Sequence, residues 1–190
     1  MPSHTPRHTI LQQTAAFNEA LAREHYLHSI GLKDKLETVP IYKKYALLFS
    51  KKNIALAAAA LAQSSNTLDE RTNRNLHAFL VEGTIGNALK RETEKVHNYE
   101  AAATITVNNK KIPYRHVGNL IVNQSDRAKR KQLFDACQPI RTKLSAMEKK
   151  LMDKEKKLLK ELTGQDYLTF FKTYKGIDYD ALSEQLRLFL

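Results

Sequence analysis

The stretch that decides the fold is Thr104-Ile-Thr-Val-Asn-Asn-Lys-Lys-Ile-Pro-Tyr114, which lies between two long segments of helical pattern. Ile105 and Val107 alternate with threonines, and this period of two is typical of a half-buried strand. Asn108 and Asn109 tolerate the positive φ angles that a tight hairpin turn needs. No other stretch has this pattern, so the sequence predicts a single β-hairpin. Because a two-stranded hairpin alone is marginally stable in water, we expect it to lie against helices or to pair with a strand of another chain.

A long helix is predicted before the hairpin, from Asp69 to Ala103. Its apolar residues recur at sums of three and four, which is typical of a helix with one buried face. They are Leu76, Phe79, Leu80, Leu89, Val96 and Ala103 itself. Gly83 and Gly86 lie in its middle, and each costs about 1 kcal/mol relative to alanine in an exposed helix interior. We therefore expect a kink at these glycines or a close contact with another helix.

A second long helical segment is predicted after the hairpin, opening at Ser125-Asp126-Arg127. Ser125 is expected to be the N-cap, and Asp126 suits the positive end of the helix that follows. Pro139 should kink or end this segment. The helical pattern resumes at Ile140 and continues to Leu162.

Shorter helices are predicted on either side of these segments. Their residue ranges are about 5–30, 38–49, 51–63, 166–175 and 179 onward, read from apolar spacing, caps and breakers. Residues 116–122 are expected to form a short apolar helix or a turn. The predicted fold class is mainly α, with long antiparallel helices and one small β-hairpin from about Thr104 to Tyr114. The length suits a single helical domain over residues 1–190, with a subdivision into residues 1–66 and 67–190.

The composition narrows the class of protein. Hydrophobic residues make up 42% of the chain, which is enough for a buried core. No run of about 18 apolar residues occurs, which argues against a membrane span, and the N-terminus lacks the apolar region of a signal peptide. Together with the single cysteine, Cys137, these features favour a cytoplasmic protein.

The formal net charge of +11 is high for this length and raises the question of a polyanionic partner. Basic residues gather at 127–131 and again between Arg141 and Lys160. In the second cluster Glu148, Asp153 and Glu155 alternate with lysines, and such mixing is typical of a solvated, salt-bridged helix face. The pattern therefore disfavours nucleic acid as a partner.

The sequence contains no recognisable catalytic site. None of the seven histidines is followed by glutamate, so the His-Glu-x-x-His motif of zinc hydrolases is absent. The pairs His4/His8 and His25/His28 have helical spacing but no third ligand at a recognisable distance, and we expect them to be surface histidines. The apolar register of Cys137 predicts core packing. We predict no catalytic residue, no metal ligand and no cofactor in this chain.

One candidate interaction site lies at the C-terminal end of the sequence. Leu182, Leu186 and Phe189 are spaced four and three residues apart, and Leu190 follows four residues after Leu186. These spacings place the four side chains on one helix face. An apolar helix end without a polar cap is unusual for a chain terminus. We expect this face to meet either a second copy of the chain or a catalytic lobe that follows it.

Several groups of residues from about Ala22 onward carry a family resemblance. They are Arg71–Leu80, Glu100-Ala101, Asn109–Tyr114, Asn123-Gln-Ser-Asp-Arg127 with Arg130, Leu162-Thr-Gly164-x-x-Tyr167 and Phe189-Leu190. On these residues the chain resembles the N-terminal helical region of the thimet oligopeptidase and oligoendopeptidase F class of zinc metallopeptidases. Gln124 stands where similar members have glutamate. The His-Glu-x-x-His helix, which lies C-terminal to the matched region in such enzymes, is absent.

The resemblance implies a lobe that walls the substrate channel of an oligoendopeptidase-like zinc metallopeptidase. The chain would then be the N-terminal lobe of a larger protein, with a peptide as substrate and with zinc and the catalytic residues in a downstream lobe. A second class of function stays open, in which the chain is a free-standing basic helical module that binds nucleic acid or a protein. The sequence does not decide whether the chain belongs to an enzyme.

Overall fold

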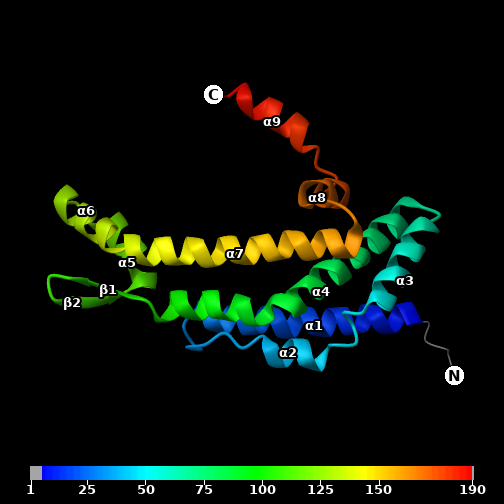
Figure 1. Ribbon diagram of the computed structural model, residues 1–190, viewed down its shortest axis with the longest axis horizontal. Coiled ribbons are helices and arrows are strands. Elements are labelled where there is room, and N and C mark those ends of the chain that lie inside the picture. The colour runs from blue at the N-terminus through cyan, green and yellow to red at the C-terminus, as the bar shows by residue number, and fades with distance from the viewer. Residues whose placement is uncertain (1–5, 190) are drawn as a thin grey trace. The chain divides into compact units, whose positions relative to one another are not determined.

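The computed structural model describes residues 6–189, with side chains described from residue 9 onward. Its elements in chain order are α1 (Pro6–Ser29), α2 (Val39–Lys44), α3 (Lys51–Ala62), α4 (Thr67–Ala102), β1 (Thr104–Val107), β2 (Lys110–Pro113), α5 (Tyr114–Asn123), α6 (Arg127–Ala136), α7 (Gln138–Thr163), α8 (Tyr167–Lys175) and α9 (Tyr179–Arg187). The described residues are thus mainly helical with one small hairpin (Figure 1), which confirms the predicted fold class.

The chain forms two compact units, each built from stretches that are separate in the sequence. The first unit contains Met1–Phe17, Lys43–Ala88 and Lys154–Leu190. The second contains Asn18–Tyr42 and Leu89–Asp153. Helices α1, α2, α4 and α7 contribute residues to both units, and the subdivision at residue 66 stays a prediction.

The hairpin belongs to the second unit and has the predicted boundaries. Strands β1 and β2 pair antiparallel, with Thr104 opposite Pro113 and Val107 opposite Lys110. The turn residues between the strands have positive φ angles of 50° and 61°, which asparagine adopts more readily than most residues. The sequence pattern therefore located both the strands and the turn.

A hydrophobic core holds the hairpin against the helices of the second unit. Ile105 of β1 is 3% exposed and packs with buried residues of α4, α5, α6 and α7. These are Val96, Val117, Leu133, Ile140 and Leu144, with Cys137 between α6 and α7. Burial against helices stabilises a hairpin that would be marginal alone. Of the two expected arrangements, the structure shows the one inside the chain.

The core of the first unit is built around three phenylalanines. The ring centroid of Phe17 lies 4.7 Å from that of Phe49 and 5.9 Å from that of Phe79, in edge-to-face geometry that aromatic pairs favour. Phe49 also lies against Gly83 of α4, where an added Cβ would come within 2.0 Å of the ring. The expected close contact at a glycine of α4 is therefore present, but it comes from a loop residue rather than from another helix.

Helix α2 is shorter than predicted and ends at Lys44. The chain then turns, so that Leu48 and Phe49 reach the core from outside a helix. The side-chain amide of Asn53 donates to the carbonyl oxygens of Leu47 at 3.1 Å and Leu48 at 2.9 Å. These bonds satisfy two carbonyls of the turn, where no helix hydrogen bonds are available to them. Apolar spacing alone did not show where the helix ends.

Helix ends follow the predicted capping residues with one exception. The hydroxyl of Ser50 caps α3 by accepting from the backbone N–H of Asn53 at 3.3 Å. The N-cap of α6 is Asp126 rather than Ser125, because the Asp126 carboxylate accepts from the N–H groups of Ala128 and Lys129 at 2.8 and 3.2 Å. An ionised acceptor binds N–H groups more strongly than a hydroxyl does.

Proline 139 lies at the division between the two helices that follow this cap. Helix α6 ends at Ala136 and α7 begins at Gln138, so the proline occupies the first turn of α7. Its missing N–H costs nothing there, because the first N–H groups of a helix have no partner within it. The predicted interruption of the segment is confirmed.

Candidate functional site

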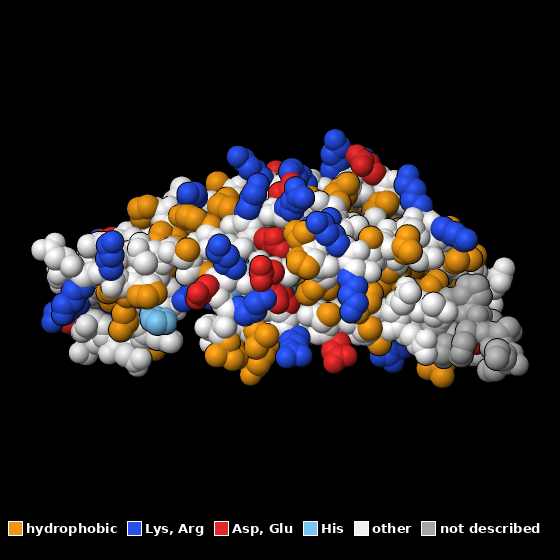
Figure 2. All heavy atoms as spheres, turned by 90° about the horizontal axis from the view of Figure 1, so that it is seen from below, with side chains coloured by type: hydrophobic (Ala, Val, Ile, Leu, Met, Phe, Trp, Pro, Cys, Tyr) orange, Lys and Arg blue, Asp and Glu red, His pale blue; other side chains and the backbone are white. Residues whose placement is uncertain are grey.

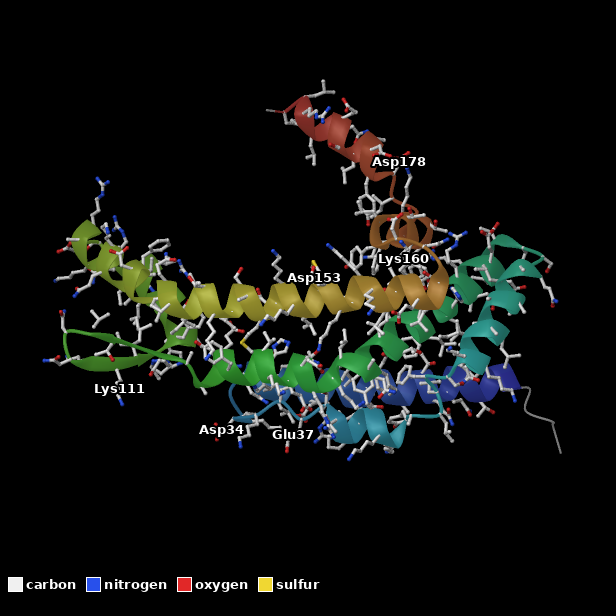
Figure 3. All side chains as sticks on the ribbon, viewed as in Figure 1. Asp34, Glu37, Lys111, Asp153, Lys160 and Asp178 are labelled. Carbon is white, nitrogen blue, oxygen red and sulfur yellow. The ribbon has the colours of Figure 1, made fainter. Side chains whose placement is uncertain are left out.

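The predicted interaction face lies on α9, the last helix of the first unit. Asp178 begins this helix by accepting from the backbone N–H groups of Asp180 and Ala181 at 3.1 and 3.3 Å (Figure 3). Leu182 is 41% exposed and Leu186 is 55% exposed, and no residue between Tyr179 and Arg187 is buried.

The end of this face departs from the predicted regular helix. Helix α9 ends at Arg187, and Phe189 lies in a turn in which its N–H donates to the carbonyl of Leu186 at 3.1 Å. Phe189 is 87% exposed, and Leu190 lies outside the described residues. The structure therefore presents three of the four predicted side chains to solvent without showing a partner for them.

Helix α8 is the neighbour of α9 in the chain and is firmly attached to α4. The hydroxyl of Tyr174 faces the carbonyls of Arg74 and Asn75, the latter at 2.7 Å, and accepts from the N–H of Ala78 at 3.1 Å. Burial raises the pKa of this phenol. Phe170 on the same helix is 4% exposed. In contrast, α9 projects from α8 without lying along another helix of its unit (Figure 1).

Two cavities of the first unit offer polar surfaces but no catalytic arrangement. One, of about 650 Å³, lies between α4 and α8, and its charged lining includes Arg71, Arg74 and Lys175 as well as Glu70 and Glu82. Arg74 forms an ion pair with Glu70. The other, of about 430 Å³, is lined by residues of α3, α4, α7 and α8 and by the segment that joins α7 to α8. Neither lining includes a serine or cysteine that could act as a nucleophile.

The second cavity contains one histidine, His77, on a wall that mixes apolar and polar side chains. His77 is half-buried, and burial lowers the pKa of its imidazole. Ile54, Ala55 and Ala58 of α3 line the cavity near it, and Lys51 and Glu161 carry opposite charges on the lining. The lining thus combines an imidazole, a carboxylate and an ammonium with apolar side chains.

The prediction of surface histidines is wrong for His28. Its side chain is buried, at 3% exposure, in the second unit. A guanidinium nitrogen of Arg115, on α5, lies 3.3 Å from its Nδ1 and 3.2 Å from its Nε2. The ring of His97, on α4, lies 6.4 Å from that of His28 and 5.8 Å from that of His25, measured between centroids. His4 lies outside the described residues, and the side chain of His8 is not described.

The described histidines belong to no group of side chains that could hold a metal ion. Within residues 6–189, no group of three His, Cys, Asp or Glu side chains is arranged to hold a metal ion. Cys137 is 1% exposed, and burial raises the pKa of its thiol, so the predicted core role of this residue is confirmed. A neutral, buried thiol is a poor nucleophile.

The basic residues of α6 and α7 are largely exposed and only partly paired. Lys131 pairs with Asp135 at 2.5 Å, and the Nζ of Lys157 lies 3.9 Å from a carboxylate oxygen of Glu161. Figure 2 draws the face on the side of α1 and α2, where Lys and Arg side chains are interspersed with acidic and hydrophobic ones. Exposed pairs of this kind contribute little to stability.

Comparisons with known proteins give no identification: no family model, no curated protein and no solved structure matches this chain. Among the helices of the described residues, none combines the length and the apolar character needed to cross a lipid bilayer. Arg115 and Tyr174 were not singled out from the sequence. Their contacts join residues 87 and about 100 positions apart, and no local spacing signals such contacts.

Proposed function

We propose that the chain is the N-terminal, substrate-channel lobe of an oligoendopeptidase-like zinc metallopeptidase. The zinc ion, the general base and the peptide-cleaving chemistry would lie in a downstream catalytic lobe. The role of this chain's own residues would be to form a rigid helical wall against which a peptide is held. The lobe would by itself neither hold zinc tightly nor cleave peptides.

One observation carries the proposal: several residues that make the family resemblance support turns, caps and loops of the second unit. Asn109 occupies the hairpin turn at a φ of 61°. Asp126 caps α6. A guanidinium nitrogen of Arg130 donates to the carbonyl oxygens of Gln124 and Ser125 at 2.6 and 2.8 Å, which fixes the loop before that cap. These side chains are supports of the fold, which is the role expected of motif residues in a lobe without catalytic groups.

The exposed face of α9 supports the same proposal. Burying one leucine or phenylalanine side chain contributes roughly 1.5–3 kcal/mol. A partner that buried all three exposed side chains would therefore gain a substantial binding free energy. In the proposed enzyme, the catalytic lobe would cover Leu182, Leu186 and Phe189. Gln124, which stands where similar members have glutamate, lies in the loop that Arg130 binds through backbone carbonyls. Its side-chain oxygen accepts from the N–H of Asp126 at 3.1 Å, a bond that glutamate could also accept.

The experiment that tests the proposal begins with the gene. The reading frame beyond codon 190 is expected to continue into a His-Glu-x-x-His motif. The protein extended through that lobe should cleave a quenched fluorescent peptide, a chelator should abolish the cleavage, and zinc should restore it. Residues 1–190 alone serve as one control, and replacement of the motif glutamate by glutamine serves as the other. A stop codon after Leu190, with no His-Glu-x-x-His protein co-purifying with the chain, would contradict the proposal.

The alternative function is a basic helical binding module, and one observation favours it. The guanidinium of Arg141 lies 4.4 Å from the ring centroid of Phe134, which is 46% exposed, so a cation and an aromatic ring are presented together. Nucleic-acid-binding surfaces often combine these groups. Submicromolar affinity for a duplex or single strand that persists at physiological salt would support this function, whereas weak binding that collapses with salt would reject it.

A further inference from the structure

The C-terminal end of α1 holds an unusual cluster of basic groups in the second unit. His28 is buried in the last turn of the helix, and His25 lies one turn earlier. His97 of α4 approaches both rings, with centroid distances of 6.4 and 5.8 Å. Arg115 of α5 completes the cluster. Three imidazoles and one guanidinium thus meet where three helices of this unit converge.

Arg115 binds the end of α1 in two ways. One guanidinium nitrogen donates to the backbone carbonyl of His28 at 3.2 Å, and the other lies within 3.3 Å of both ring nitrogens. The last carbonyls of a helix have no partner within it and carry a partial negative charge. Arg115 therefore supplies the cation that this helix end favours, and it attaches α5 to α1 by doing so.

The cluster has little negative charge available to stabilise a second cation. The acidic group that faces it is Glu24, which is 9% exposed. Both oxygens of this carboxylate already accept from the ammonium of Lys33, at 2.9 and 2.7 Å, and one of them accepts from the N–H of Glu37 at 2.8 Å. A proton added to His28 would place an imidazolium beside Arg115, His97 and His25, with a counter-ion that is already engaged.

The pKa values agree with this geometry. The pKa of His28 lies below its ordinary value, first because of burial and then because of Arg115, His97 and His25, with Glu24 opposing. The pKa of His25 is also lowered, first by burial and then by His97, again with Glu24 opposing. At neutral pH both rings are therefore neutral, and no imidazolium competes with Arg115 for the helix end.

We propose that Arg115 and a protonated His28 compete for the C-terminal end of α1, so that this junction is a proton-sensitive latch between α1 and α5. In the neutral state Arg115 occupies the helix end and α5 is held. In weak acid the imidazolium takes over the favourable interaction with the helix end, repels the guanidinium, and releases α5 from α1. A proton on His25 adds to the effect, because it places a further positive charge in the cluster.

The direction of the pH dependence follows from the lowered pKa. A histidine whose pKa is lower in the closed state binds a proton more readily once the latch opens. The latch therefore contributes its full stability above the ordinary histidine value of about 6.5, and this stability falls as the pH drops from there through the lower value of the closed state. Below that value no further loss is expected from this group.

The experiment measures hydrogen exchange of the α5 amides and the ring titration of His28 by NMR. From about pH 7.5 to about pH 5.5, across the ordinary histidine range, protection factors in α5 should fall. A pKa difference of one unit corresponds to about a tenfold fall, so a tenfold or larger loss is expected when more than one ring titrates. In Arg115→Gln the titration of His28 should shift to higher pH, and the protection of α5 should be low already at neutral pH.

A matched control is His116→Gln, which removes an exposed histidine next to Arg115 in sequence and should behave as the wild type. Arg115→Lys keeps the positive charge and should shift the titration less than Arg115→Gln. Since the wild-type exchange measurement needs no variant, a variant that fails to fold does not block the test. Equal α5 protection at the two pH values, or an unchanged His28 titration in Arg115→Gln, would overturn the proposal.

Discussion

Replacing Gly83 by alanine should destabilise the first unit, although alanine is the better helix former. The added Cβ would lie 2.0, 2.6 and 2.9 Å from three atoms of the Phe49 ring, distances at which atoms overlap. The ring cannot easily move aside, because Phe49 is 7% exposed and packs against Phe17 and Phe79. Alanine at this position therefore requires Phe49 to leave its place in the core.

The size of the effect follows from two opposing contributions. Losing the burial of a phenylalanine costs roughly 3–5 kcal/mol. Exchanging glycine for alanine in a helix raises the free energy of unfolding by about 1 kcal/mol. The net loss in free energy of unfolding should be about 2–4 kcal/mol, which for a chain of this size lowers the melting temperature by about 4–16 °C. Urea and thermal unfolding followed by circular dichroism measure both quantities.

A double-mutant cycle with Phe49→Ala tests the cause. In that background the clash is absent, so Gly83→Ala should be neutral or stabilising by up to about 1 kcal/mol. Gly118→Ala in α5 is the matched control, because an added Cβ there meets nothing within 4 Å and its φ is not positive. It should be neutral or slightly stabilising. An increase in stability on Gly83→Ala in the wild-type chain would refute the reasoning.

Further substitutions test the caps, the α8 contact and the α9 face. Ser50→Ala should lower the free energy of unfolding by about 0.5–2 kcal/mol, because it removes the α3 cap; an unchanged urea midpoint would contradict this. Tyr174→Phe should cost about 0.5–1.5 kcal/mol through the lost hydroxyl bonds to α4, measured in the same way. Asp126→Ala should destabilise the protein at neutral pH but not in strong acid, since its N–H partners hold the pKa of Asp126 low and the contribution disappears as the pH falls through that value. Leu186→Lys and Phe189→Lys should reduce self-association in light scattering and binding of a hydrophobic dye; a wild-type monomer at high concentration that binds no dye would contradict an exposed adhesive face.

Local patterns in the sequence predicted the elements of this fold well. The hairpin turn depends on two adjacent asparagines, and helix ends at Ser50, Asp166 and Asp178 depend on a side chain and the N–H groups two or three residues later. Such contacts are short-range, so spacing shows them. The prediction of Ser125 as the N-cap was wrong, because serine and aspartate both favour this position and the two are adjacent. The N-cap in the structure is Asp126.

Contacts between distant residues explain the features that the sequence did not predict. His28 was expected at the surface, because no third ligand accompanies the His25/His28 pair in the sequence. Only the contact with Arg115, 87 residues later, shows why it is buried. The same holds for Phe49, which helical spacing placed inside α2 and which the structure places in a turn against Gly83. Neither partner has a sequence spacing that signals the contact. The α9 face differs, because its spacing was readable from the sequence, and Leu182, Leu186 and Phe189 are exposed as that spacing suggested.

The residues that carry the family resemblance have structural roles in this fold. Asn109, Asp126 and Arg130 fix a turn, a cap and a loop, and Gly164 ends α7 at a φ of 73°. Each of these residues supports the local backbone, so the resemblance that they carry points to no reaction by itself. A peptidase function therefore depends on a metal-binding motif outside the described residues. The latch at His28 and Arg115 needs no such motif, because all of its groups lie in the second unit, and it can be measured on this chain alone.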